Sequence, residues 1–177
     1  MTFTYFADPL GFAFMAEPGT ECHFCRSIED CLDGYCLRGV ETVEAVCFSC
    51  LRDGRLKDLE IEANEIDLAA LDPEKCDPSG VADEIIYRTP PLPTWQDGSW
   101  PVKEGRACRF LKIASKQDYA SKEEFLGSLH DCDNDDPEEL WVRLPEHAIH
   151  DLKEGQYDIS FYLFDDNGGK LTVWDAN

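Results

Sequence analysis

The sequence predicts an α+β fold, in which a cysteine-rich N-terminal module packs on a mixed region that ends in an antiparallel β-hairpin. Six of the nine cysteines lie within residues 1–52, helical and strand patterns are mixed after that, and two apolar runs flank a glycine-rich turn near the end. With 177 residues, of which 43% are hydrophobic, the chain suits one compact unit better than two full-sized domains. We therefore expect a module at residues 1–52 and an α+β region at residues 53–177.

The N-terminal module contains two Cys-x-x-Cys pairs, Cys22 with Cys25 and Cys47 with Cys50, which are separated by 21 residues. This spacing is close to that of four-thiolate zinc sites, where each pair forms a knuckle that turns two thiolates toward a tetrahedral ion. Such a site leaves no position for water and is structural. The pairs therefore predict a zinc-ribbon-like module. A redox dithiol is the weaker alternative, because nothing in the sequence places either pair at the start of a helix in a βαβ unit.

Five cysteines lie outside the two pairs. Cys31 and Cys36 lie between them and could replace one member of the ligand set, although small core residues or exposed thiols are the ordinary interpretation. Cys76, Cys108 and Cys132 stand alone, and we assign each of them to packing.

Residues 53–88 read as helical, because five apolar residues recur at roughly helical spacing among charged ones: Leu56, Leu59, Ile66, Leu68 and Leu71. Gly54 and the Asp72-Pro73 step bracket that helical segment. A loop is expected at Cys76–Gly80, and Val81 to Arg88 is expected to form a separate short helix that ends before Pro90. Residues 89–101 carry four prolines, so an irregular loop is expected there. Its two tryptophans, Trp95 and Trp100, form either an aromatic recognition surface or a plug at the edge of the core.

Regular structure is expected to resume with a strand from Arg109 to Ile113. Ser121 to Glu124 has the pattern of a capping box that opens a helix, and Leu140 to Leu144 alternates like a strand. The final segment reads as a hairpin, with strands at Tyr157–Phe164 and Lys170–Trp174. Both faces of the first of these strands are apolar, so we expect it to be central in its sheet.

The composition is strongly acidic, with 37 Asp and Glu against 16 Lys and Arg and a formal net charge of −21. This charge disfavours direct binding to nucleic acids or to anionic membranes and favours a basic protein partner. The candidate contact is the densest acidic run together with the two loop tryptophans: Asp131, Asp133, Asp135, Asp136, Glu138, Glu139, Trp95 and Trp100. No secretory segment is recognisable, and we expect a cytoplasmic protein.

Known catalytic motifs are absent from the sequence, which contains neither a Gly-x-Ser-x-Gly pattern nor a P-loop. Whether the protein is an enzyme stays open. A zinc-dependent or thiol enzyme could still assemble its site from Trp95, Cys108 and distant residues, because sequence spacing does not exclude it.

Several segments occur in a fixed order along the chain: Phe3–Pro9, Cys22–Cys25, Cys47–Gly54, Arg88–Pro90 before Trp95 and Trp100, Cys108–Leu111, Tyr162–Phe164 and Val173–Asp175. In this order they resemble the CbrC-type bacterial proteins, a group linked by name to colicin tolerance. The chain departs from that pattern in three places. Pro91 replaces a glycine, a cysteine before Cys108 is missing, and Asp165–Gly169 stands where another Cys-x-x-Cys is usual. A second metal site in the C-terminal half is therefore not expected.

Together these features suggest an acidic, zinc-containing binding protein, an immunity protein or antitoxin that neutralises a basic, nuclease-type toxin. Immunity proteins use acidic residues to occupy the basic cleft of a nuclease, which fits the net charge of −21. The enzyme described above and a structural zinc-binding adaptor are the alternatives.

Overall fold

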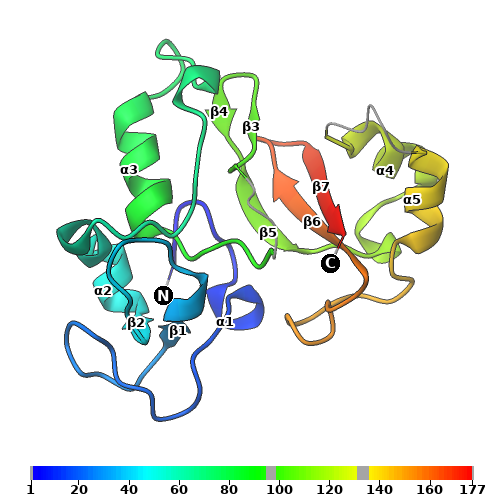
Figure 1. Ribbon diagram of the computed structural model, residues 1–177. Coiled ribbons are helices and arrows are strands. Elements are labelled where there is room, and N and C mark those ends of the chain that lie inside the picture. The colour runs from blue at the N-terminus through cyan, green and yellow to red at the C-terminus, as the bar shows by residue number, and fades with distance from the viewer. Residues whose placement is uncertain (1, 95–98, 131–135, 177) are drawn as a thin grey trace.

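The computed structural model describes residues 2–94, 99–130 and 136–176. Figure 1 shows a three-stranded sheet between the N-terminal elements on one side and two short helices, α4 and α5, on the other. The helices are α1 Pro9–Phe12, α2 Phe48–Arg52, α3 Pro78–Arg88, α4 Lys122–Ser128 and α5 Pro137–Arg143. The strands are β1 Cys31–Asp33, β2 Ala45–Cys47, β3 Val102–Lys103, β4 Arg106–Ala107, β5 Arg109–Ile113, β6 Ile159–Asp165 and β7 Lys170–Ala176. The predicted α+β class is confirmed. None of the helices in the described ranges is long and apolar enough to cross a membrane.

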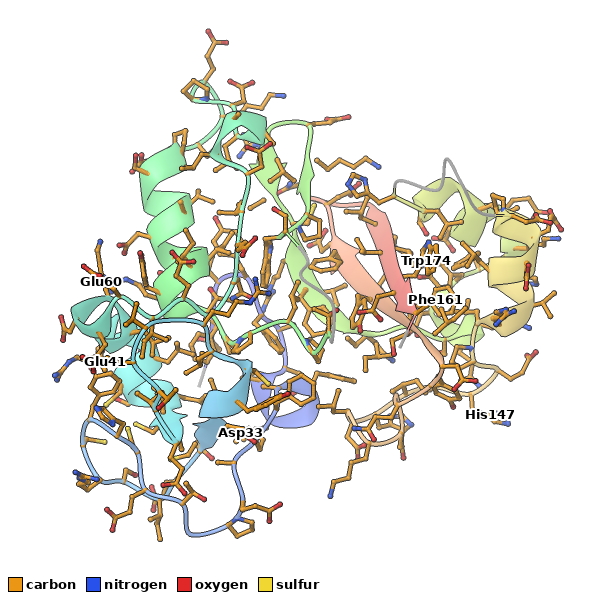
Figure 2. All side chains as sticks on the ribbon, in the orientation of Figure 1. Asp33, Glu41, Glu60, His147, Phe161 and Trp174 are labelled. Atoms are coloured by element: carbon orange, nitrogen blue, oxygen red, sulfur yellow. The ribbon has the colours of Figure 1, made fainter. Side chains whose placement is uncertain are left out.

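The C-terminal hairpin is present as predicted, and β6 is the central strand of the order β5-β6-β7. Its alternating side chains enter two different cores. Phe161 and Leu163 pack with α4 and α5, whereas Tyr162 and Phe164 pack with the N-terminal half of the chain. Figure 2 shows Phe161 and Trp174 on the side of the sheet that faces α4 and α5. Both faces of β6 are therefore buried, as expected for a central strand.

The N-terminal segment ties residues 1–52 to this sheet. The backbone of Phe6 lies parallel to Phe110 in β5, where the Ala7 N–H donates to the Phe110 carbonyl and the Phe110 N–H donates to that of Tyr5. The Phe6 ring is fully buried, with its centroid 4.7 Å from that of Phe110. One apolar cluster consequently runs from the cysteine-rich residues into the sheet.

The predicted strand at Leu140–Leu144 is wrong, because these residues belong to α5 and its C-cap. Asp136 caps the helix by accepting a hydrogen bond from the Glu138 N–H, and Pro137 occupies the first turn, where its missing N–H costs nothing. Leu140 and Leu144 are four residues apart and point to the same side of a helix, so both are buried. The helix predicted after Ser121 is confirmed as α4, with the Ser121 hydroxyl accepting from the Glu124 N–H.

The helical segment expected between Gly54 and the Asp72-Pro73 step is also wrong, whereas the short helix expected at Val81–Arg88 is confirmed within α3. Only α3 is a full helix, and the preceding residues form two short 3-10 turns at Arg55–Leu59 and Leu68–Ala70. Both ends of the first turn have left-handed backbone, with φ of 75° at Gly54 and 53° at Glu60, so a single α-helix cannot continue through either position. Glu62 then pairs with Arg38 in an isolated bridge, so tertiary pairing overrides the apolar spacing.

Candidate metal centre

The first cysteine pair forms a tight turn beside the β1–β2 hairpin. The Arg26 N–H donates to the Cys22 carbonyl, and the Cys22 N–H donates to that of Ser27, which closes the turn on both sides. Arg26 adopts a left-handed φ of 64°, and the His23 N–H binds the Ala45 carbonyl at 2.8 Å. The knuckle predicted for Cys22 and Cys25 is therefore present and is fixed to β2.

The second pair differs from the expected knuckle, because it lies at the beginning of helix α2. Cys47 ends β2 and is the N-cap of α2, and its Sγ accepts the Cys50 N–H at 3.5 Å. The module is thus a knuckle, a hairpin and a helix rather than two ribbon knuckles. A pair of cysteines at a helix start is one feature of a redox dithiol. The strands β1 and β2 are antiparallel, however, and form no βαβ unit with α2.

The four paired cysteines converge on one point, and their sulfur atoms all lie within 4.8 Å of one another. Cys25 Sγ and Cys47 Sγ, one from each pair, are 3.5 Å apart. A tetrahedral ion with four sulfurs at 2.3 Å requires sulfur–sulfur distances of about 3.8 Å. The donor set and its spacing therefore fit a metal ion, with Cys22, Cys47 and Cys50 buried and Cys25 exposed.

The metal-free thiols differ in acidity. Burial opposes ionisation of Cys22, but the backbone N–H groups of Cys47, Cys25 and Phe24 outweigh it and lower the Cys22 pKa to about 7. Burial raises the pKa of Cys47 and of Cys50, with neighbouring thiols adding to the effect at Cys50. A bound cation would supply the positive charge that a fully ionised set needs.

Neither cysteine between the pairs joins the cluster. The Cys31 thiol donates to the carbonyls of Ser27 and Glu29, and burial raises its pKa to about 11. Cys36 is half-buried, and burial followed by the charge of Asp33 raises its pKa to about 11 as well. Both thiols are protonated packing groups at neutral pH.

The residues suggested for an enzyme site do not form a reactive thiol. Cys108 is 1% exposed, and burial raises its pKa to about 11, so it is no ready nucleophile. Trp100 is also 1% exposed and donates its indole N–H to the Cys108 carbonyl at 2.7 Å. Of the two alternatives for Trp100, the structure therefore favours the one in which its ring is buried at the core and is not part of a recognition surface. Trp95 and Cys132 lie outside the described residues.

The predicted acidic contact is described only in its last part, because Asp131, Asp133 and Asp135 lie outside the described residues. The remaining three carboxylates are exposed: Glu138 and Glu139 belong to α5, and Asp136 is its N-cap. Asp136 caps the helix, Glu138 pairs with Lys122 of α4, and Glu139 pairs with Arg143 one turn later. Two of these three charges are thus paired with a cation inside the protein.

One buried polar group escaped the sequence interpretation. Asp175 on β7 is 6% exposed, and its two carboxyl oxygens lie against the hydroxyls of Tyr162 and Thr94. The alternating pattern of β7 assigns Asp175 to a face but does not reveal that the proline-rich loop closes over it. No sequence signal could have found this contact.

The chain is thus an α+β protein with a four-cysteine centre that can hold one metal ion. It belongs to the Uncharacterised protein family (UPF0167), whose model matches residues 1–166. No curated protein and no solved structure matches it. The family match does not carry the CbrC name, and that finer resemblance stays a prediction.

Proposed function

We propose that the cysteine centre binds one structural zinc ion in an acidic protein that binds a basic partner. The observation that carries the zinc proposal is the convergence of four thiols within 4.8 Å, a group that contains no His, Asp or Glu among the described residues. Cys22 and Cys25 would hold the ion from the knuckle, and Cys47 and Cys50 would hold it from the start of α2. A bound zinc supplies a cross-link, because four thiolates leave no open coordination position.

This cross-link would stabilise a region with little regular structure of its own. Strands β1 and β2 have three residues each and α2 has five, too few for independent stability. Gly34, just after β1, has no room for a side chain, since a Cβ there would lie 1.7 Å from the Val43 carbonyl oxygen. The hairpin is therefore tightly closed, and an ion at its base would join it to α2.

The zinc proposal is tested by replacing one cysteine of each pair. Purified protein should contain close to one zinc per chain, and Cys22→Ser with Cys47→Ser should lose it and melt at a lower temperature. Structural zinc contributes on the order of 10 kcal/mol in small modules, although here the attached sheet should retain part of the fold. Cys36→Ser is the matched control and should keep its zinc. Unchanged zinc and melting temperature in the double variant would refute the site.

The partner proposal rests on the charge that remains after internal pairing. Twelve of the sixteen Lys and Arg form ion pairs within the described residues, yet the formal charge is −21. Such an excess of carboxylates attracts a cationic surface. A basic nuclease toxin, neutralised by this protein as an immunity protein or antitoxin, is the partner we propose.

Calorimetry against basic nuclease domains, including any encoded by a neighbouring gene, tests the partner. Saturable binding at a defined stoichiometry, with loss of nuclease activity, is the expected result. The competing functions are a structural adaptor and an enzyme. If no basic domain binds, and the purified protein turns over a small molecule instead, the enzyme is favoured.

A further inference from the structure

The four paired cysteines differ in how they meet solvent. Three of them are buried, whereas Cys25 is exposed, and no other cysteine within the described residues is exposed. Its neighbours His23 and Arg26 are exposed as well, so this side of the knuckle faces water. A small reagent dissolved in water therefore meets the four-cysteine centre at Cys25.

A second thiol of the centre lies close enough to pair with Cys25. Cys47 Sγ is 3.5 Å from Cys25 Sγ, and the two residues belong to different Cys-x-x-Cys pairs. The sulfur atoms of a disulfide are about 2.05 Å apart, so these two need to approach by only about 1.5 Å. Cys47 Sγ accepts the Cys50 N–H, which holds it at the start of α2. Cys25 lies on an exposed turn, which can supply the movement.

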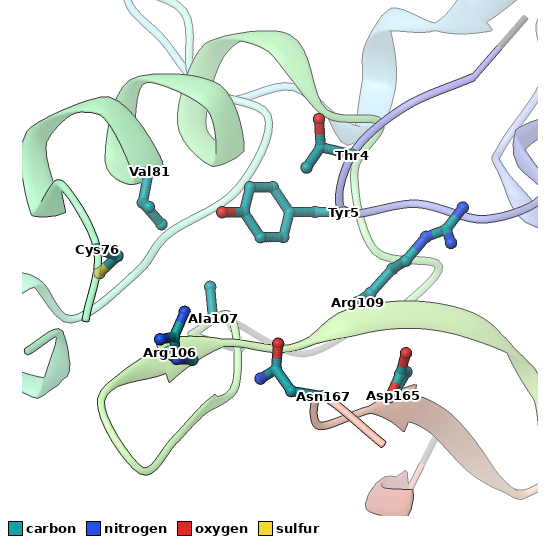
Figure 3. Close-up of a pocket in the computed structure, with 9 residues that line it drawn as sticks. All are labelled: Thr4, Tyr5, Cys76, Val81, Arg106, Ala107, Arg109, Asp165 and Asn167. Atoms are coloured by element: carbon teal, nitrogen blue, oxygen red, sulfur yellow. The ribbon is translucent and has the colours of Figure 1, made fainter. Parts of the chain in front are cut away.

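The thiols outside the centre are poor competitors for the same reagent. Burial raises the pKa of Cys36 and of Cys108 to about 11, and a protonated thiol is a weak nucleophile. Figure 3 shows Cys76 on the wall of a small cavity near Val81, where its thiol is half-buried and donates to the Asp72 carbonyl. In a metal centre all ligand thiols are ionised, so access decides which of them reacts.

We propose that Cys25 is the site at which hydrogen peroxide oxidises the four-cysteine centre, and that Cys47 completes the reaction. The Cys25 thiolate attacks one oxygen of the peroxide and breaks its O–O bond, which gives a sulfenic acid on Cys25 and hydroxide. The Cys47 thiolate then attacks the Cys25 sulfur, forms the disulfide and displaces a second hydroxide. Each sulfur loses one electron, the peroxide gains two, and two protons from solvent convert both hydroxides to water.

The disulfide changes what the centre can hold. Only two of the four thiolates remain as ligands, so a bound zinc ion would be lost. This loss rests on the zinc proposal above, whereas the pairing of Cys25 with Cys47 rests on the distance between their sulfurs. The disulfide joins the knuckle to the start of α2, the two parts that the ion would join. Oxidised metal-free protein should therefore melt at a higher temperature than reduced metal-free protein, because a cross-link constrains the unfolded chain.

Titration of the zinc-loaded protein with hydrogen peroxide tests the proposal. A chromogenic chelator should report loss of the ion, and mass spectrometry without reduction should find the peptides of Cys25 and Cys47 linked. Any sulfenic acid that a selective reagent traps in the centre should be on Cys25. A dithiol with added zinc should restore the loaded protein, because a disulfide is reversible and a sulfinic acid is not.

The proposal is overturned if the protein keeps its zinc in peroxide, if the trapped sulfenic acid is on another cysteine of the centre, or if the disulfide joins other cysteines. A protein that binds no zinc would instead refute the proposed function. In that case the same disulfide map of the metal-free protein still decides whether Cys25 pairs with Cys47.

Cys25→His separates the thiolate from its role as a ligand. Three cysteines and one histidine are a common zinc set, so the variant should keep its zinc. In peroxide it should lose the ion at least roughly tenfold more slowly than wild type, because the reactive nucleophile is a thiolate. The matched controls, which lie outside the centre, should lose zinc at the wild-type rate: Cys36→Ser, Cys76→Ser and Cys132→Ser. Equal rates for Cys25→His and wild type would contradict the proposal, and if the variant holds no zinc, the wild-type disulfide map decides.

Discussion

The environment of Asp175 shows how a single proton can satisfy a buried polar network. The Tyr162 hydroxyl lies 2.9 Å from Asp175 Oδ1 and 3.1 Å from the Pro93 carbonyl oxygen, but it has only one proton to donate. If Asp175 is ionised, its Oδ1 accepts the hydrogen bond from the Tyr162 hydroxyl. The Pro93 carbonyl is then left without a donor. If Asp175 is protonated, it donates to the Tyr162 oxygen, and the Tyr162 hydroxyl is free to donate to Pro93. The protonated form therefore gives Asp175, Tyr162 and the Pro93 carbonyl a hydrogen-bond partner each.

Burial accordingly raises the Asp175 pKa above its ordinary value of about 3.9, against the opposing hydrogen bonds from Thr94 and Tyr162. Tyr162 stays protonated throughout, because burial and the Asp175 charge raise its pKa too. A carboxyl with a raised folded-state pKa stabilises the fold fully below its unfolded pKa. That stability is lost as the pH rises through the folded-state value.

We predict that Asp175→Asn removes this pH dependence. The amide can donate to the Tyr162 oxygen and accept from Thr94, as the protonated acid does. Relative to the variant, wild-type protein should therefore lose free energy of unfolding as the pH rises from about 4, by about 1–3 kcal/mol, the cost of one unsatisfied buried group. Denaturant melts across the pH range measure this difference. Glu41→Gln, at an exposed carboxylate, is the control, and parallel curves for wild type and Asp175→Asn would contradict the prediction.

At the scale of elements, the cysteine centre joins the first knuckle, the β1–β2 hairpin and α2, all of which are short. The central strand β6 is instead held by side chains in two cores, with Phe161 and Phe164 both fully buried on opposite faces. Local stability should therefore differ between these elements, since opening free energies follow buried contacts.

We predict that removing the metal with a chelator increases hydrogen exchange in residues 22–52 far more than in β6. The His23 N–H, bound to the Ala45 carbonyl, should be among the first amides to lose protection. Returning zinc should restore the original pattern, which is the control for chelator effects. Equal loss of protection in both regions would contradict the prediction, because it would mean that residues 22–52 and β6 unfold together.

At the scale of the whole molecule, the net charge of −21 governs how the protein meets its proposed partner. Electrostatic attraction extends over the Debye length, about 8 Å at physiological salt. Association with a basic protein should therefore slow as salt is added, whereas dissociation should change much less. Stopped-flow or surface-binding kinetics over a salt series measure both rates.

We predict that Asp133→Asn, Asp135→Asn and Asp136→Asn together slow association several-fold if the acidic run faces the partner. The matched control removes three exposed carboxylates from the N-terminal module: Glu29→Gln, Glu41→Gln and Glu44→Gln. Equal slowing in both triple variants would assign the steering to net charge and not to the acidic run.

The sequence by itself determined those features that depend on spacing along a short stretch. Two Cys-x-x-Cys pairs fix the chemistry of the centre, since cysteines three positions apart bring two sulfurs together both in a tight turn, as at Cys22 and Cys25, and at a helix start, as at Cys47 and Cys50. The alternation of Ile159 to Phe164 determined that β6 has two apolar faces and therefore lies inside a sheet. The capping pattern at Ser121 likewise determined where α4 begins.

Only the tertiary structure decided the features for which local spacing is ambiguous or silent. Leu140 and Leu144 suit one face of a strand as well as of a helix, and the cap at Asp136 with packing against α4 decides for the helix. The position of Cys47 at a helix start depends on where β2 ends against β1. The Tyr5 carbonyl accepts the Phe110 N–H only because the N-terminal segment lies along β5. Contacts between residues about a hundred positions apart leave no local pattern, because they are selected by the burial of Phe6 and Phe110 in a shared core.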